Sequence, residues 1–137
     1  YKRTGEYGEC AINHLINAYK RGAFSRDLQW NLSQENSKLL FYSSCTYCND
    51  LPSTRITKTG ETILYNGIDR VDNAKGYELN NCVPCCGVCN RRKSDANVAE
   101  FISWVCKVYK NLLAIGNSPE NGYAKAVFSQ AAVRNAR

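Results

Sequence analysis

Methionine is absent from this sequence, whose 137 residues include only 9 glycines, 3 prolines and 1 histidine. So little glycine and proline excludes collagen-like and low-complexity chains. No apolar run approaches the roughly 18 residues that a membrane-spanning helix needs, which excludes a membrane-spanning protein. The charged and then apolar start of a secretory signal is also missing. Because the chain begins at Tyr1, we expect a processed or truncated start.

The rest of the composition is typical of a globular domain. Hydrophobic residues make up 44% of the chain and aromatic residues 11%, which excludes a disordered chain. A domain usually has about 100–150 residues, and at this length folding buries roughly two thirds of the surface. We therefore expect one domain over residues 1–137, with a poorly ordered tail over 117–137.

The chain is basic, with 18 Lys and Arg residues against 12 Asp and Glu residues, a net charge of +6. This charge favours a polyanionic partner such as nucleic acid, although many other soluble proteins reach it as well.

Eight cysteines give the most informative pattern. Cys45-Thr-Tyr-Cys48 and Cys86-Gly-Val-Cys89 are two CxxC pairs, separated by the 37 residues from 49 to 85. Each CxxC pair can fold into a tight knuckle, and two knuckles supply the four thiolates of a tetrahedral Zn²⁺ site. The sequence therefore predicts a structural zinc, for which buried thiols or disulfides are the alternative.

The other cysteines are interpreted as structural. Cys85 is an alternative to Cys86 as a ligand, although the spacing Cys85-x3-Cys89 fits a knuckle less well. Cysteines that bind metal rather than form disulfides are typical of a reducing, intracellular compartment. We expect three further cysteines to be small buried hydrophobic residues: Cys10, Cys82 and Cys106.

Apolar spacing predicts helices on both sides of this cysteine region. Residues 10–21 carry apolar side chains at i, i+3, i+4 and i+7, the pattern of an amphipathic helix, with Gly22 as its C-cap. His14 lies in this helix, and we expect it on the helix surface. Ser33 and Asn97 are suitable N-caps for two further helices.

Short strands are expected between the CxxC pairs. Residues 63–71 and 82–85 have the composition of strands, the second of them at a sheet edge because it contains a proline. Residues 54–62 are predicted to form a polar surface loop, residues 72–76 a turn, and residues 90–93 a short helix. Helices and short strands together predict an α+β fold.

The stretch from Gly67 to Lys93, GIDRVDNAKGYELNNCVPCCGVCNRRK, resembles the HNH endonucleases, specifically the zinc-stapled members of phage or organelle type. The resemblance covers residues 10–112 and is dense over 45–105. It implies a small zinc-stapled ββα-metal core, or His-Me finger, with flanking amphipathic helices. It also implies a divalent cation that is held between a strand and a helix against the scissile phosphate.

The resemblance assigns roles to four residues. Asp69 matches the carboxylate metal ligand at the end of the first strand, and Asn90 matches the second ligand, which is His or Asn in this family. Asn81 matches the central Asn that braces the loop. Arg70 stands where the family usually has the His that acts as general base.

These residue types suit phosphodiester hydrolysis. The oxygens of Asp69 and Asn90 are ligands that Mg²⁺ or Mn²⁺ accepts, with coordination positions left for water and phosphate. A turn carboxylate and a helix N-cap are the simpler interpretations of the two residues. Three basic residues that follow are expected to bind DNA phosphates, with a solvated helix face as the alternative: Arg91, Arg92 and Lys93.

Arg70 is the main departure from the family pattern. Arginine stays protonated and cannot act as an ordinary general base, and the loss of such a base costs roughly 10²–10⁴-fold in rate. Asp72, a metal-bound hydroxide or a bound phosphate are candidates to accept the proton. Arg70 is itself a candidate phosphate clamp or stabiliser of the transition state.

We therefore predict a metal-dependent DNA endonuclease that hydrolyses phosphodiester bonds, contains structural zinc and uses Mg²⁺ or Mn²⁺. Double-stranded DNA is the expected partner, with no membrane and no small-molecule substrate. The first alternative, favoured by Arg70, is a catalytically weak or inactive zinc module that binds nucleic acid or an assembly. The second is a zinc module for protein–protein contact.

Overall fold

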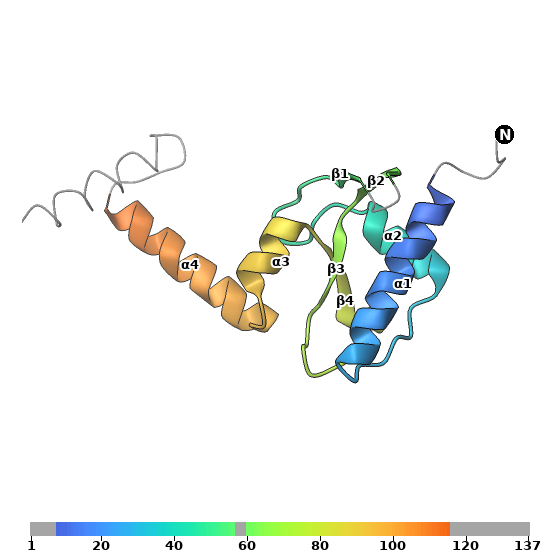
Figure 1. Cartoon of the computed structure of the whole chain (residues 1–137). Coiled ribbons are helices and arrows are strands. Elements are labelled where there is room, and N and C mark those ends of the chain that lie inside the picture. The colour runs from blue at the N-terminus through green and yellow to red at the C-terminus, as the bar shows by residue number, and fades with distance from the viewer. Residues whose placement is uncertain (1–7, 57–59, 116–137) are drawn as a thin grey trace, which may run out of the picture. The chain divides into compact units, whose positions relative to one another are not determined.

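The computed structural model describes residues 8–56 and 60–115 of the chain. The α+β class is confirmed, because two helices precede and two helices follow a region of two short antiparallel hairpins (Figure 1). The predicted tail over 117–137 lies outside the described residues. The elements, in chain order, are α1 (Glu9–Ser25), α2 (Gln34–Tyr42), β1 (Ser53–Ile56), β2 (Thr62–Tyr65), β3 (Gly67–Arg70), η1 (Leu79–Asn81), β4 (Cys82–Cys85), α3 (Gly87–Lys93) and α4 (Val98–Ala114).

The chain divides between Val98 and Ala99 into two compact units. The first unit contains every element from α1 to α3, and the second contains α4 from its second residue onward. The expectation of one domain over 1–137 stays a prediction. None of the helices in the described part of the chain is long and apolar enough to cross a membrane.

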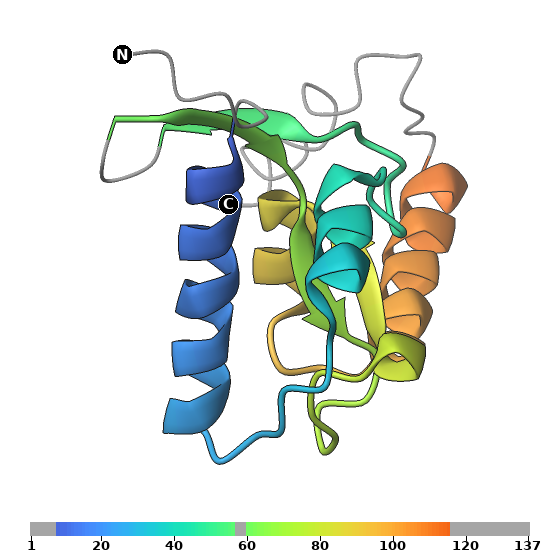
Figure 2. The same ribbon diagram turned by 90° about the vertical axis from the view of Figure 1, so that its right-hand side faces the viewer.

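The core of the first unit forms where α1 and α2 meet the two hairpins. Ile12 and Ile16 of α1 and Phe41 of α2 are buried, together with Ile63 of β2 and Ile68 of β3. Helix α2 contacts both strands of the β3–β4 hairpin, and Figure 2 shows these elements side by side. The predicted apolar stripe of α1 is therefore confirmed, because its members face this core.

Local hydrogen bonds determine where α1 ends and where α2 begins. Helix α1 continues beyond Gly22, so the prediction of a C-cap at that glycine is wrong. The Gly22 carbonyl accepts hydrogen bonds from Ser25 Oγ at 3.0 Å and Arg26 Nε at 2.9 Å, which hold the final turn. The predicted N-cap at Ser33 is confirmed, since its Oγ accepts a bond from the Asn36 amide at 3.1 Å.

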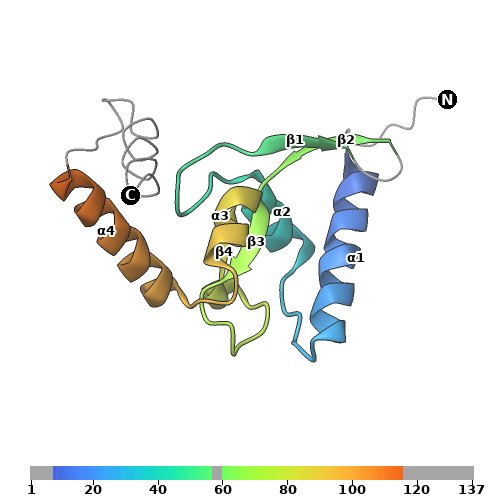
Figure 3. The same cartoon turned by 60° about the vertical axis from the view of Figure 1, so that its left-hand side comes forward.

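The two hairpins have different relations to the predicted strands. The β3–β4 hairpin, which pairs Gly67 with Cys85 and Arg70 with Cys82, follows the prediction. The β1–β2 hairpin does not, because residues 53–56 form a strand where a loop was expected (Figure 3). All four residues of β1 are exposed. Its strand structure therefore depends on backbone pairing with β2. Because no side chain of β1 is buried, its sequence shows no apolar alternation that would predict a strand.

A close backbone contact fixes the turn between β3 and β4. The Tyr77 amide donates to the Gln29 carbonyl at 2.8 Å. A Cβ atom at Gly76 would lie 2.5 Å from the Gln29 carbonyl oxygen, so only glycine fits there without a shift of the backbone. This contact ties the turn to the segment that joins α1 and α2.

Candidate active site and zinc cluster

Four cysteine sulfurs converge at one side of the β3–β4–α3 unit. The Sγ atoms of Cys45, Cys48, Cys86 and Cys89 all lie within 4.8 Å of one another, and those of Cys48 and Cys86 are 3.7 Å apart. A tetrahedral zinc with Zn–S bonds of about 2.3 Å separates its sulfurs by about 3.8 Å. The four predicted ligands therefore fit a zinc ion.

Backbone hydrogen bonds form the knuckle that presents the first two of these sulfurs. The Asn49 amide donates to the Cys45 carbonyl at 2.9 Å, and Asn49 takes a left-handed φ of 63°. The Thr46 amide donates to the Pro84 carbonyl at 2.9 Å, which ties the knuckle to β4. The spacing of two residues between the cysteines thus produces a turn that is anchored to the second pair.

Backbone amides make the thiol of Cys45 easier to deprotonate. Burial opposes ionisation of this thiol, but the backbone amides of Cys86, Cys48 and Tyr47 donate to its sulfur and lower its pKa to about 7. On the other side of the cluster, Cys86 is the N-cap of α3, and its Sγ accepts a bond from the Cys89 amide at 3.3 Å. Metal ligation requires such sulfur atoms in their deprotonated form.

The remaining cysteines only partly follow expectation. All eight thiols are free, which is against the disulfide alternative. Cys85 is buried outside the cluster, so Cys86 is the residue that joins Cys89 in it. Cys82 is buried as predicted, but the prediction is wrong for Cys10 and Cys106, which are exposed. Cys10 lies just outside the buried stripe that begins at the next residue of α1.

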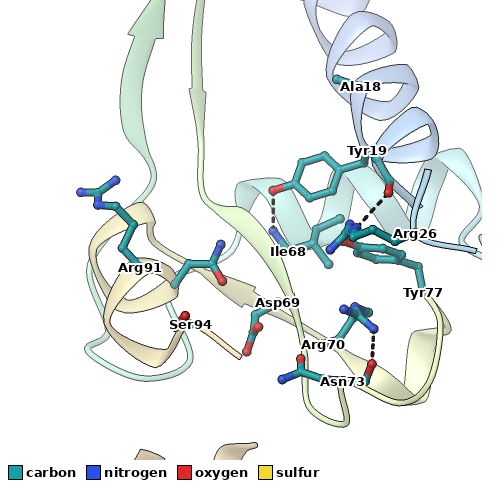
Figure 4. A pocket seen from close by; sticks show the side chains of 12 residues that line it. Ala18, Tyr19, Arg26, Ile68, Asp69, Arg70, Asn73, Tyr77, Arg91 and Ser94 are labelled. Carbon is teal, nitrogen blue, oxygen red and sulfur yellow. Dashed lines mark hydrogen bonds between the residues drawn. The ribbon is translucent and has the colours of Figure 1, made fainter. Parts of the chain in front are cut away.

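A cavity of about 670 Å³ opens beside β3, and it is lined from α1, β3, the loop after β3 and α3. Three of the four residues singled out for catalysis line it, namely Asp69, Arg70 and Asn90. Figure 4 shows Asp69, Arg70 and Arg91 around this space. The full lining is Ala18, Tyr19, Gly22, Arg26, Ile68, Asp69, Arg70, Asn73, Tyr77, Asn90, Arg91 and Ser94.

Asp69 is the only carboxylate among the described residues that line this cavity, and it is held from two sides. Its Oδ2 accepts a hydrogen bond from Tyr47 Oη at 2.7 Å. Its Oδ1 lies 3.3 Å from Lys93 Nζ, and the two side chains are 6% and 0% exposed. Asp69 therefore forms a buried ion pair whose carboxylate has a fixed orientation.

Lys93 does not lie where the sequence interpretation placed it. We expected it to bind DNA phosphates, but the residue is only 1% exposed. It is the last residue of α3, and its ammonium faces Asp69 and the Arg70 carbonyl, to which it donates at 3.4 Å. The charge of Lys93 is therefore used inside the unit, whereas Arg91 and Arg92 are exposed on the same helix.

Tyr47 is a site residue that the sequence interpretation missed. Burial and the hydrogen bond to Asp69 raise the pKa of its phenol, which keeps it protonated and a donor to that carboxylate. The residue lies inside the first CxxC pair. The Cys45–Cys48 knuckle therefore positions the phenol. The place of Tyr47 between the two cysteines was the sequence signal that could have pointed to it.

Arg70 is fixed by the loop that follows β3. Its Nη1 donates to the carbonyls of Asn73 and Lys75, both at 2.7 Å, and its Cζ lies 5.5 Å from the ring centre of Tyr77. Tyr77 also binds Arg26, whose Nη2 donates to the phenol oxygen at 2.9 Å. Arg26 was missed because it reaches the cavity from the end of α1, far away in sequence.

Asn81 and Asp72 shape the loop between β3 and β4. Asn81 Oδ1 accepts from the Asp72 amide at 2.9 Å, and its Nδ2 donates to the Asp72 and Gly76 carbonyls at 3.1 and 2.9 Å. The predicted bracing of the loop by Asn81 is confirmed. Asp72 Oδ1 caps the turn by accepting from the Ala74 amide at 2.9 Å, and Asp72 is not among the described cavity residues.

His14, the single histidine of the sequence, is exposed on α1, as predicted, and is not among the described residues of this cavity.

A β-hairpin followed by a short helix, beside a four-cysteine cluster, defines a fold of the HNH type. The rare-cutting HNH restriction endonuclease PacI has this fold, with a TM-score of 0.56 and 20% identity over 85% of this chain and 89% of that one. No family model matches the sequence. The uncharacterized protein R423 of Acanthamoeba polyphaga mimivirus is 39% identical over 84 residues, which are 61% of this chain and 14% of that protein. The chain thus spans a small part of that viral relative.

Proposed function

We propose that this chain is a metal-dependent endonuclease that hydrolyses phosphodiester bonds in DNA. The observation that carries this proposal is the cavity in which the Asp69 carboxylate and the Asn90 amide lie beside the guanidinium groups of Arg26, Arg70 and Arg91. Three cations against one carboxylate favour a phosphate-bearing ligand. The structural likeness to an HNH restriction endonuclease supports DNA as that ligand.

Asp69 and Asn90 are the residues that would hold the catalytic cation. Carboxylate and amide oxygens suit Mg²⁺ or Mn²⁺, and both residues line the same cavity. When bound there, such an ion would stabilise the charge that develops on the phosphate and on the leaving oxygen. Tyr47 and Lys93 each contact a different oxygen of Asp69, so they would fix the direction in which the carboxylate faces the ion.

Arg70 acts in this proposal as a fixed cation for the phosphate. Its bonds to two backbone carbonyls hold the guanidinium at the cavity wall, so little side-chain entropy is lost when it binds an anion. Because it remains protonated, it cannot take the proton of the attacking water. Asp72 caps a turn and is not among the described cavity residues, so neither Arg70 nor Asp72 takes that proton in this proposal.

The first prediction concerns Arg70. Arg70→His removes a cation held by two backbone carbonyls, and we expect the cleavage rate to fall by roughly 10-fold or more, since a single positioned charge donor is worth about 10²–10³-fold in other enzymes. Rates should be measured on plasmid DNA at saturating metal. A rise of the rate would instead mean that Arg70 is only a lost base position, which histidine restores.

The second prediction concerns phosphate binding by Arg91, an exposed residue that lines the cavity. Arg91→Gln should weaken DNA binding for all sequences alike and reduce the slope of log K against log salt by about 0.9, the value for one neutralised phosphate. Fluorescence anisotropy at several salt concentrations measures this slope. Lys38→Gln, which removes the same charge from α2, should leave the slope unchanged. Equal slopes for Arg91→Gln and the unaltered chain would contradict the assignment.

Plasmid nicking tests the proposed function directly. The chain should convert supercoiled plasmid to nicked or linear DNA in the presence of Mg²⁺ or Mn²⁺, and EDTA should stop the reaction. Salt-sensitive DNA binding without any cleavage would favour the alternative of a binding module, in line with the missing base at Arg70. Absence of both binding and cleavage would favour a zinc module for protein contacts.

The matched relative is a viral protein, which supports a viral origin for this chain. A phage or organelle source, a reducing intracellular compartment and the choice of double-stranded DNA stay predictions.

A further inference from the structure

A second group of metal-binding side chains lies at the opposite end of α1 from Arg26. Cys10 Sγ, a ring nitrogen of His14 and a carboxylate oxygen of Glu61 all lie within 4.8 Å of one another. The three residues belong to neither the zinc cluster nor the cavity beside β3. We propose that Cys10, His14 and Glu61 form a second transition-metal site, most suited to Zn²⁺, which joins α1 to the β1–β2 hairpin.

The secondary structure brings these three side chains together. Cys10 and His14 are four residues apart on α1, so they lie one turn above each other on the same helix face. Glu61 directly precedes β2 and is two residues from Ile63, which is buried in the core that includes Ala11 and Ile12. Because side chains alternate along a strand, Glu61 lies on the same side as Ile63, the side that faces α1.

The ribbon agrees with this placement. Figures 2 and 3 both show the far end of the β1–β2 hairpin beside the N-terminal end of α1, where Cys10 and His14 lie. Helix α1 and strand β2 are in contact. His14 also lines a groove of about 570 Å³ between α1 and this hairpin, together with Arg21 and Arg55.

The donor set indicates the class of metal. Thiolate, imidazole and carboxylate are all ligands of Zn²⁺, whereas a thiolate and an imidazole disfavour Mg²⁺ and Ca²⁺. Three protein ligands leave the fourth tetrahedral position to water. Cys10 and His14 are exposed, so an ion can reach them without unfolding of the helix.

The hairpin is the element that such an ion would stabilise. Every residue of β1 is exposed, and an isolated two-stranded hairpin is marginally stable in water. A metal coordinated by Cys10 and His14 of α1 and by Glu61 would link this hairpin to the core. This inference does not depend on nuclease activity.

Zinc content of the full chain provides the test. After equilibration with Zn²⁺ and removal of unbound ions, mass spectrometry should find two zinc ions per chain, and Cys10→Ser with His14→Asn should reduce this to one. Cys106→Ser, a change at an exposed cysteine of α4, should leave two. Glu61→Gln should lower the affinity for the second ion by about 10-fold or more, since the loss of even an indirect partner of a metal lowers metal affinity by that much.

Thiol reactivity provides a second measurement on the unaltered protein. Zn²⁺ should slow the alkylation of Cys10 by iodoacetamide and leave that of Cys106 unchanged, as mapped by peptide mass spectrometry. One zinc ion per chain, or a Cys10 alkylation rate that is the same with and without Zn²⁺, would overturn the proposal. Circular dichroism of the variants checks that each is folded before its metal content is compared.

Discussion

Removal of zinc from the cluster of Cys45, Cys48, Cys86 and Cys89 is expected to unfold the first unit of the chain. Structural zinc contributes about 10–16 kcal/mol of apparent binding energy in small modules, and this energy is also folding energy. Whole domains are stable by only about 5–15 kcal/mol. The free energy lost with the ion is therefore as large as the whole stability of such a unit, and the unit should unfold.

The architecture around the cluster explains this dependence. Both hairpins have strands of four residues, and α3 has seven residues. Two-stranded hairpins of this kind need support from another element. The ion would join the knuckle at residues 45–50 to the start of α3, which in turn carries Lys93 to Asp69. The zinc cluster and the candidate active site are therefore parts of one folded unit.

Thermal unfolding followed by circular dichroism measures the effect. Cys48→Ser should abolish the cooperative transition, or lower its midpoint by tens of degrees, because 1 kcal/mol corresponds to roughly 4–8 °C in a domain of this size. Cys106→Ser should leave the curve unchanged, since that exposed thiol is not part of the cluster. An unchanged curve for Cys48→Ser, or for zinc-free protein, would contradict the prediction.

The four-cysteine cluster could be predicted from the sequence because each of its two halves is a local motif. Each CxxC pair forms its own turn, so the spacing of Cys45 and Cys48 already determines where their sulfurs can meet. The same holds for Asn81, whose side chain bonds within the loop of its own hairpin. In both cases part of the arrangement is formed between sequence neighbours, although the two CxxC pairs meet each other only in the folded unit.

The parts that could not be predicted depend on contacts between distant segments. Arg26 and Tyr47 reach the site from α1 and from the zinc knuckle, and no local pattern marks their partners. Helix α3 is too short for its apolar periodicity to show which face is buried, so Lys93 was assigned to the surface. The exposed strand β1 has no apolar alternation, and its pairing with β2 alone makes it a strand.

Replacement of Asp69 by asparagine is expected to reduce cleavage by at least about 10³-fold, because the change removes the only carboxylate that would hold the catalytic ion, and an ion is worth several kcal/mol in the transition state. DNA binding should be unchanged or tighter, since a negative charge near the phosphate is lost. Asp95→Asn, at an exposed carboxylate residue just after α3, is the matched control and should keep full activity.

The buried ion pair with Lys93 requires a second variant. Asp69→Asn leaves the Lys93 ammonium buried without a counter-charge, which costs about 3–5 kcal/mol in comparable pairs, so lost activity could reflect lost folding. Lys93→Met in the same chain removes that charge and should restore the melting temperature. Cleavage should stay absent in the double variant, because the ion still lacks its carboxylate. If the double variant recovers both stability and cleavage, Asp69 has only a structural role and the proposed metal site is wrong.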